Sequence, residues 1–267
     1  MEKSKAAVRD FWQAAACGEV YAVGGTTDER FAAHSQARYT LEPYIRPFAR
    51  FDGTDKAVLE VGVGMGADHV EWAKSHPSRL VGVDLTPMAI ERAHEHITLV
   101  GLTSELLVGD AENLPFSDET FDLVYSWGVL HHTPDTERAF AEVCRVLRPG
   151  GQARLMIYHR PSFVGLMLWL RYGLLAGRPL RSQADLYAHH LESPGTRGFT
   201  AREARQLLDG FSSSAVTSQV SFGDLLQGEV GQQHGSGIVR MAKRLWPRSL
   251  VNRVPSLGLV LLIEATK

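Results

Sequence analysis

Short apolar runs alternate with amphipathic stretches through the middle of the chain. Five apolar runs predict buried strands over residues 57–62, 79–84, 105–109, 121–127 and 152–158. Stretches with helical spacing lie between them and predict helices over 67–75, 87–100 and 135–147. Strands that are apolar on both faces and alternate with helices indicate a doubly wound α/β fold, in which helices cover both faces of a mostly parallel sheet.

The N-terminal segment departs from this alternation. Residues 1–55 predict a helical cap with one helix over 6–16 and another over 37–51. Pro43 and Pro47 should break or kink the second helix, because proline removes a backbone donor.

The alternation also stops after the fifth strand. Residues 161–199 predict an insertion, and Thr200 to Glu203 form a capping-box signature that opens a further helix. Two late strands are predicted over 215–222 and 257–266, separated by a glycine-rich turn region and a basic helix over 239–254. We therefore expect a cap (1–55), a core (56–160), an insertion or lid (161–199) and a C-terminal part of the sheet (200–267).

Composition narrows the class of protein. The chain has 267 residues, and 28 basic against 30 acidic side chains argue against a nucleic-acid partner. Its two cysteines, Cys17 and Cys144, cannot form a disulfide framework or a zinc site, so we expect a reducing, cytoplasmic location. The first residues lack the apolar region of a secretory signal, and the apolar stretch over 163–175 is too short to span a membrane.

The glycine-rich segment after the first strand is the first candidate for chemistry. Gly62, Gly64 and Gly66 lie between a strand and a helix, where a ligand can approach the backbone closely and meet free N–H groups. Asp84 ends the second strand, about 20 residues further on, where a carboxylate can accept hydrogen bonds from ribose hydroxyls.

This loop also fits a dinucleotide-binding pattern, with Ala67 in the last position, so a nicotinamide-dependent oxidoreductase is an alternative. Glu60 argues against it, because an acid at the end of the first strand would repel a pyrophosphate and suits an ammonium or sulfonium group. Asp110 follows the third strand in GDAENLPF, where it could accept a hydrogen bond from an adenine amine.

Together with FDLVYSWGVLHH and LRPGG, these motifs resemble the class I S-adenosylmethionine-dependent methyltransferases, in the group that includes the ubiquinone and menaquinone methyltransferases. The resemblance covers roughly residues 55–160. It implies a Rossmann-like sheet of seven strands whose last strand is antiparallel, and S-adenosylmethionine as the cofactor. The segment 257–266 is placed to be that last strand.

The resemblance also implies a set of cofactor contacts. An acid and three glycines form the first motif, Asp84 holds the ribose, Leu85 lies beside the adenine, a second acidic segment frames the adenine, and the end of the fourth strand lies under the methionine part. The matching positions here are Glu60, Gly62, Gly64, Gly66, Asp84, Leu85, Asp110, Ala111, Glu112, Ser126 and Trp127. Similar enzymes use an N-terminal cap, and Tyr39 is our candidate for an aromatic ring that faces the sulfonium.

No general base follows from the resemblance, because methyl transfer needs one only when the nucleophile carries a proton of high pKa. Candidates from the sequence are His131 after the fourth strand, Tyr158 and His159 at the end of the fifth, and His189 in the insertion. Each also has a structural interpretation, as a core or cap side chain. No carboxylate stands at ligand spacing near the histidines, so we expect no metal.

The insertion bears on the acceptor. Residues 162–177 are almost wholly apolar, which fits a cap helix packed on the core or a lid that binds a lipophilic acceptor and touches a membrane surface. The leading prediction is therefore an enzyme that methylates a small molecule, with a lipophilic acceptor as one interpretation. A protein that binds S-adenosylmethionine without transferring its methyl group is a further alternative. No Asn/Asp-Pro-Pro-Tyr motif follows the fourth strand, which lowers the case for a nucleic-acid or protein methyltransferase.

Overall fold

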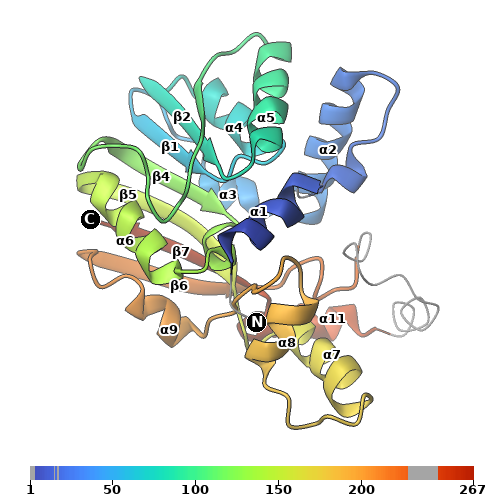
Figure 1. Cartoon of the computed structure of the whole chain (residues 1–267). Helices are drawn as coiled ribbons and strands as arrows, with labels where there is room; N and C mark the ends of the chain where they lie inside the picture. Colours follow the sequence, from blue (N-terminus) through green and yellow to red (C-terminus); the bar gives the residue numbers. More distant parts are fainter. Residues whose placement is uncertain (1–3, 15, 17, 228–245) are drawn as a thin grey trace.

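Seven strands form one sheet in the order β3-β2-β1-β4-β5-β7-β6 in the computed structural model, which describes residues 4–14, 16, 18–227 and 246–267 (Figure 1). The strands are β1 (Ala57–Val61), β2 (Arg79–Asp84), β3 (Glu105–Val108), β4 (Phe121–Trp127), β5 (Leu147–Tyr158), β6 (Ser213–Gln219) and β7 (Val260–Thr266). Four pairs of strands are parallel: β1 with β2, β1 with β4, β2 with β3, and β4 with β5. β7 is antiparallel to both β5 and β6, so the predicted fold with an antiparallel last strand is confirmed.

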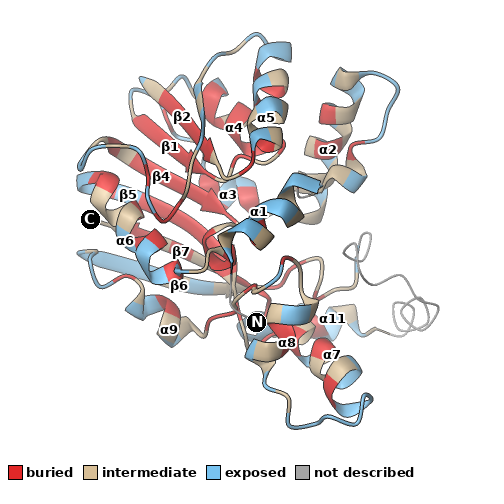
Figure 2. Cartoon of the chain, in the orientation of Figure 1, coloured by how far each residue is buried: buried red, intermediate tan, exposed pale blue. Residues whose placement is uncertain are grey.

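The sheet is covered on both faces, as continuous apolar strands require. Every residue of β1 is buried (Figure 2). Its apolar side chains are divided between two hydrophobic cores. Leu59 belongs to the core that contains Phe140 and Ala204, whereas Val58 belongs to the core that contains Phe48 and Trp72. The helices of this part are α4 (Ala67–Lys74), α5 (Pro87–Leu99), α6 (Thr136–Val146), α9 (Ala201–Gln206) and the short α11 (Arg248–Val251).

The N-terminal cap differs from the prediction in its second helix. The structure has α1 (Lys5–Ala14), α2 (Thr27–Leu41) and α3 (Ile45–Ala49), so the helix predicted over 37–51 is wrong. Pro43 lies between α2 and α3, where the predicted kink becomes a break. The start of α2 is marked in the sequence by a capping box, in which Thr26 and Glu29 satisfy each other's backbone N–H groups.

The insertion forms a separate helical layer beyond the carboxyl ends of the strands (Figure 1). It consists of α7 (Phe163–Trp169), a π-helical continuation η3 (Leu170–Leu174) and α8 (Gln183–His190). Leu168 packs against Leu186 and Tyr187 of α8, and the Tyr187 hydroxyl lies 2.6 Å from the Ser162 hydroxyl at the start of α7. These contacts join the two helices to the end of β5.

The capping box at Thr200 and Glu203 is present and opens α9, as predicted. The glycine-rich turn region and most of the predicted basic helix lie outside the described residues, which resume with residue 246 and contain only α11 from that stretch. Within the described chain, no helix is long and apolar enough to cross a bilayer.

Candidate active site

The glycine loop lies where β1 ends and α4 begins. Gly62, Gly64 and Gly66 all have left-handed backbones, with φ of 87°, 51° and 76°. A Cβ added at Gly62 would lie 2.1 Å from Val129, so glycine there is required by packing. A Cβ added at Gly64 would meet no atom within 4 Å. The loop therefore presents open backbone at its centre, as a cofactor cradle needs.

Asp84 is held at the end of β2 and faces this loop. Its carboxylate accepts hydrogen bonds from the Gly64 N–H at 3.2 Å and from the Thr86 N–H and hydroxyl at 2.9 Å. Burial raises the pKa of Asp84, and the N–H bonds from Thr86 and Gly64 oppose that effect. A half-buried carboxylate with a fixed orientation beside the loop can receive ribose hydroxyls.

Glu60 lies at the end of β1 and is fixed by a buried imidazole. His69 Nδ1 is 2.9 Å from the Glu60 carboxyl, and His69 Nε2 is 2.9 Å from the Ser104 hydroxyl. Burial raises the pKa of Glu60 and lowers the pKa of His69 to about 3. The imidazole is therefore neutral, and a ligand ammonium at Glu60 would favour the ionised carboxylate.

The third acidic segment is already engaged by the cap. Lys5 of α1 forms an ion pair with Asp110 and a second, at 2.6 Å, with Glu112. Asp110 accepts the Glu112 N–H at 2.9 Å, and Glu112 accepts the Asp135 N–H at 2.7 Å. Ala111 is buried between them. Sequence reasoning missed Lys5, because nothing in a helical segment 105 residues away marks its partner.

Three further predicted contacts lie at the ends of β4 and β2. Ser126 is fully buried, and its hydroxyl donates to the Val61 carbonyl at 2.8 Å. Trp127 is buried beside Phe48 and Tyr44 of the cap, and Leu85 is half-buried next to Asp84. Their contacts with a cofactor stay predictions.

A buried charge cluster fixes α2 beneath the glycine loop. Arg38 donates two hydrogen bonds to Asp68 in the first turn of α4, and Tyr39 and Tyr125 donate to the same carboxylate at 2.9 and 2.8 Å. Burial opposes ionisation of Asp68, but the charge and hydrogen bonds of Arg38 outweigh it and lower its pKa. The Tyr39 hydroxyl is thus committed to Asp68, and a sulfonium contact of its ring stays a prediction.

A second cluster gathers at the ends of β4 and β5. The rings of His131 and Tyr158 are 4.1 Å apart, and His132 lies beside both. Tyr158 donates to the Glu192 carboxylate at 2.9 Å, and His132 Nε2 lies 3.4 Å from the same carboxylate. Trp12 of α1 packs edge-on against His132 at 5.3 Å. Core, insertion and cap therefore meet here, and Glu192 had no signal in the sequence.

The two remaining candidates lie in different surroundings. His159 is buried, its Nδ1 lies 3.0 Å from the Gly258 carbonyl, and burial lowers its pKa. His189 is exposed on α8, where it bonds to Asp185 of its own helix. The structure thus brings Tyr158 and His131 together, while His159 and His189 contact other groups, and a catalytic role for any of the four stays a prediction.

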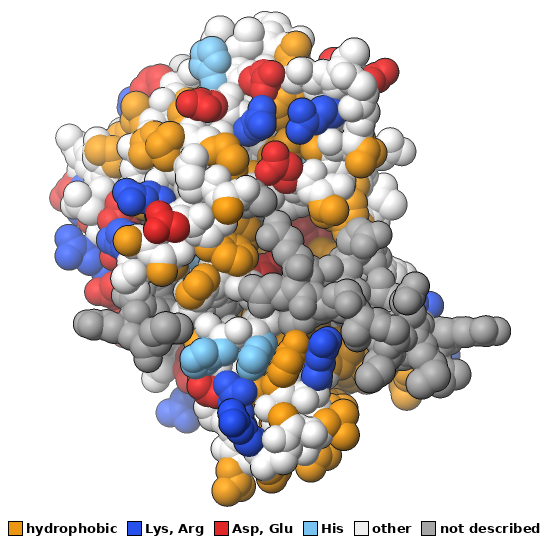
Figure 3. Space-filling view, turned by 45° about the vertical axis from the view of Figure 1, so that its right-hand side comes forward, with side chains coloured by type: hydrophobic (Ala, Val, Ile, Leu, Met, Phe, Trp, Pro, Cys, Tyr) orange, Lys and Arg blue, Asp and Glu red, His pale blue; other side chains and the backbone are white. Residues whose placement is uncertain are grey.

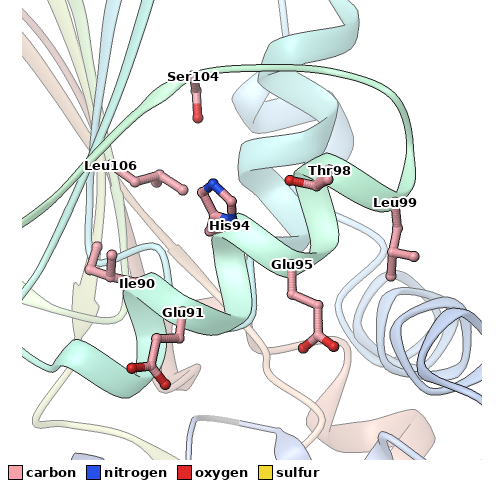
Figure 4. Close-up of a pocket in the computed structure, with 8 residues that line it drawn as sticks. All are labelled: Ile90, Glu91, His94, Glu95, Thr98, Leu99, Ser104 and Leu106. Atoms are coloured by element: carbon pink, nitrogen blue, oxygen red, sulfur yellow. The ribbon is translucent and has the colours of Figure 1, made fainter.

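A groove of about 670 Å³ lies elsewhere, between α5 and the start of β3 (Figure 4). Its lining residues are Ile90, Glu91, His94, Glu95, Thr98, Leu99, Ser104 and Leu106. None of these is a predicted cofactor residue. Since Glu60, Asp84 and Asp110 converge at the carboxyl edge of the sheet instead, we place the candidate site at that edge.

The residues at the edge fit S-adenosylmethionine. Open backbone at Gly64 leaves space for the ligand, and the three carboxylates of Glu60, Asp84 and Asp110 end three neighbouring strands. Carboxylates match a ligand that carries an ammonium, ribose hydroxyls and an adenine amine, and they do not match a pyrophosphate.

Comparison with known proteins agrees with this chemistry. Residues 59–155 match the methyltransferase domain family. The chain is 40% identical over 122 residues to the phthiotriol/phenolphthiotriol dimycocerosates methyltransferase of Mycobacterium leprae, which is 45% of this chain and 44% of that protein. It is 37% identical over 115 residues to the fatty-acid O-methyltransferase of Mycolicibacterium smegmatis, which is 43% of this chain and 41% of that protein.

The match thus spans less than half the length of these two relatives. Among solved structures, the methyltransferase bound to the Trm112 methyltransferase activator of Haloferax volcanii is similar with a TM-score of 0.60 and 19% identity. That likeness covers 97% of this chain and 96% of the other, and it shows the fold. The resemblance to class I methyltransferases is confirmed, and the oxidoreductase alternative gains no support.

Proposed function

We propose that this chain, whose residues 59–155 belong to the methyltransferase domain family, transfers the methyl group of S-adenosylmethionine to an oxygen atom of a small lipophilic molecule. The observation that carries the proposal is that Glu60, Asp84 and Asp110 lie at the carboxyl ends of three neighbouring strands, where Asp84 also bonds to the open backbone of Gly64. The names of the two relatives, a dimycocerosates methyltransferase and a fatty-acid O-methyltransferase, support a lipophilic acceptor, and the second name supports transfer to oxygen.

Each carboxylate has a distinct task in this proposal. Glu60 holds the ammonium of the methionine part, Asp84 the ribose hydroxyls and Asp110 the adenine amine. S-adenosylmethionine, when bound, supplies a methyl group on a positively charged sulfur, which needs no acid to leave. The chain then has to align the acceptor oxygen with that methyl group and to exclude water.

The cluster at the ends of β4 and β5 supplies the group that receives a proton. As the carbon–oxygen bond forms and the sulfur–carbon bond breaks, a hydroxyl acceptor must lose its proton. We assign the proton to the Glu192 carboxylate, delivered through the Tyr158 hydroxyl, which is 2.9 Å away. An acceptor that is already a carboxylate would not need this step.

The direct test follows a labelled methyl group. The protein is incubated with methyl-labelled S-adenosylmethionine and a bacterial extract, which is then separated into lipid, polar-metabolite and macromolecular fractions. We expect label in the lipid fraction. Label in either other fraction would contradict a lipophilic acceptor, and no label despite normal cofactor binding by calorimetry would indicate a binding protein without transfer.

The assignment of Glu192 makes a second prediction. Glu192→Gln should lower kcat for a hydroxyl acceptor by about 100-fold, as expected on losing a general base, and leave the Kd for S-adenosylmethionine unchanged. Rates with a fatty-acid carboxylate acceptor should stay near wild type. The matched control is Glu137→Gln, which removes an exposed ion pair with Arg197. Equal losses with both kinds of acceptor would show that Glu192 is structural.

A further inference from the structure

The helix formed by α7 and its continuation η3 is apolar on two faces. Its inner face packs on α8 through residues such as Leu168 and Tyr172. Its outer face carries Leu166, Leu170 and Leu174, spaced four residues apart and 43%, 38% and 46% exposed. A helix on the surface of a soluble domain normally has polar side chains on its outer face. This outer face therefore has an apolar surface that the fold does not use.

The turn after the helix extends this surface. Every residue from 174 to 180 is exposed, and Leu175 and Leu180 are 82% and 97% exposed. We call the five residues Leu166, Leu170, Leu174, Leu175 and Leu180 the leucine tip. Single exposed leucines are ordinary, but five exposed leucines within residues 166–180 indicate an interaction surface.

The charges at the leucine tip have one sign. Residues 161–184 contain no Asp, Glu or Lys, and their charged side chains are Arg171, Arg178 and Arg181. Arg181 pairs with Asp185 at 2.6 Å, whereas Arg171 lies over the Tyr172 ring. Figure 3 shows hydrophobic side chains together with Lys and Arg side chains at the lower end of the molecule, where α7 and α8 lie. Leucines flanked by Arg171 and Arg178 match the layer order of an anionic bilayer surface, with acyl chains inside and phosphates outside.

We propose that the leucine tip docks this protein on the surface of membranes that contain anionic phospholipid. The five leucines enter the boundary between head groups and acyl chains, and Arg171 and Arg178 contact lipid phosphates. The tip is too small to cross the bilayer, so docking is peripheral and reversible.

Docking would orient the candidate active site. Ser162, the N-cap residue of α7, lies four residues after the end of β5, and its hydroxyl is joined to that of Tyr187. The insertion lies beyond the carboxyl ends of the strands (Figure 1), so the edge that carries Tyr158 and Glu192 would lie on the membrane side of the sheet. This inference goes beyond methyl transfer, because docking requires neither cofactor nor acceptor.

The test is vesicle flotation of the full-length protein without S-adenosylmethionine. Vesicles contain phosphatidylcholine alone or phosphatidylcholine mixed with phosphatidylglycerol. We expect binding to the mixed vesicles, and at least tenfold weaker binding for Leu175→Asp/Leu180→Asp. Arg171→Gln/Arg178→Gln should lose roughly fivefold per arginine and lose the preference for phosphatidylglycerol. The control Leu99→Asp changes an exposed leucine of α5 (47% exposed), a helix at the opposite end of the molecule (Figure 1), and should bind like wild type.

Three outcomes would overturn the inference. The protein could fail to float with either vesicle, or Leu99→Asp could lose binding as much as the tip variant. The tip variant could also convert a dimer to a monomer in size-exclusion chromatography without changing flotation, which would identify a second copy of this chain as the occupant. Circular dichroism of each variant checks that it is folded. Because methyl transfer is not measured here, failure of docking would leave the proposed function standing.

Discussion

Gly64 has a strained backbone conformation that leaves space for a ligand. Its φ of 51° is a conformation that side-chain-bearing residues rarely adopt, and the space around its missing Cβ is open. Gly62 has the same handedness for a different reason, since Val129 fills the space beside it. Substituting Gly62 should therefore disturb packing, whereas substituting Gly64 should affect ligand binding.

We predict that Gly64→Ala weakens binding of S-adenosylmethionine by at least tenfold and costs about 1 kcal/mol of stability, the usual cost of a left-handed alanine. Calorimetry gives the affinity and urea unfolding gives the stability. Gly101→Ala is the matched control, because Gly101 has φ of 73° and equally open surroundings at the end of α5. Gly101→Ala should lower the free energy of unfolding by the same amount and leave the affinity for S-adenosylmethionine unchanged. Equal affinities in the two variants would remove the glycine loop from the cofactor site.

Local spacing explains which site residues could be predicted. Glu60, the three glycines, Asp84 and Asp110 follow strand ends at fixed intervals, so the sequence alone places them at one edge. Lys5 and Glu192 were missed because their partners are distant: Lys5 pairs with Asp110 across 105 residues, and Glu192 with Tyr158 across 34. No periodicity encodes such pairs.

Among the elements, α2 is joined to α4 by a buried ion pair, in addition to the stacking of Phe31 on His96 of α5. The side chains of Arg38 and Asp68 are 18% and 2% exposed, and both tyrosine hydroxyls of the cluster are donated to Asp68. The pair joins the cap to the first turn of the helix that follows the glycine loop. Displacing α2 would therefore disturb the loop as well as the cap.

We predict that Arg38→Met lowers the free energy of unfolding by about 3–5 kcal/mol, because it leaves the Asp68 carboxylate buried without its cation. Arg148→Met is the control, since Arg148 pairs with Asp122 at the surface with 47% of its side chain exposed, and it should cost less than about 1 kcal/mol. Denaturant unfolding at neutral pH measures both. A cost for Arg38→Met no larger than that of the control would show that the cluster does not hold the cap.

Element boundaries were predictable where pattern and capping agreed. α4, α5 and α6 begin and end within about two residues of their predicted limits, since apolar spacing and caps coincide there. The helix predicted over 37–51 is wrong because the capping box at Thr26 starts a helix much earlier and Pro43 follows its end. Only Phe31 and His34 of α2 are buried, and one of them is polar, so α2 has no continuous apolar stripe that the sequence could reveal.

On the scale of the whole molecule, the cap, the core and the insertion meet at one edge of the sheet. The cap contributes Lys5 and Trp12, the core contributes the strand ends, and the insertion contributes Glu192. The mostly parallel sheet with its antiparallel last strand was predicted from alternation and family resemblance, whereas the way cap and insertion close on this edge was not. Their contacts are single side-chain pairs between segments without repeating pattern.

The ion pairs of Lys5 have a consequence for turnover. If the adenine is to reach Asp110, Lys5 must first leave that carboxylate, and α1 must give way with it. The spent thioether product would depart through the same opening, so the opening of α1 would set an upper limit on kcat even if methyl transfer itself were fast. Since the Lys5 side chain is 39% exposed, added salt would weaken its ion pairs and would speed the catalytic cycle, the opposite of its usual effect on a charged active site.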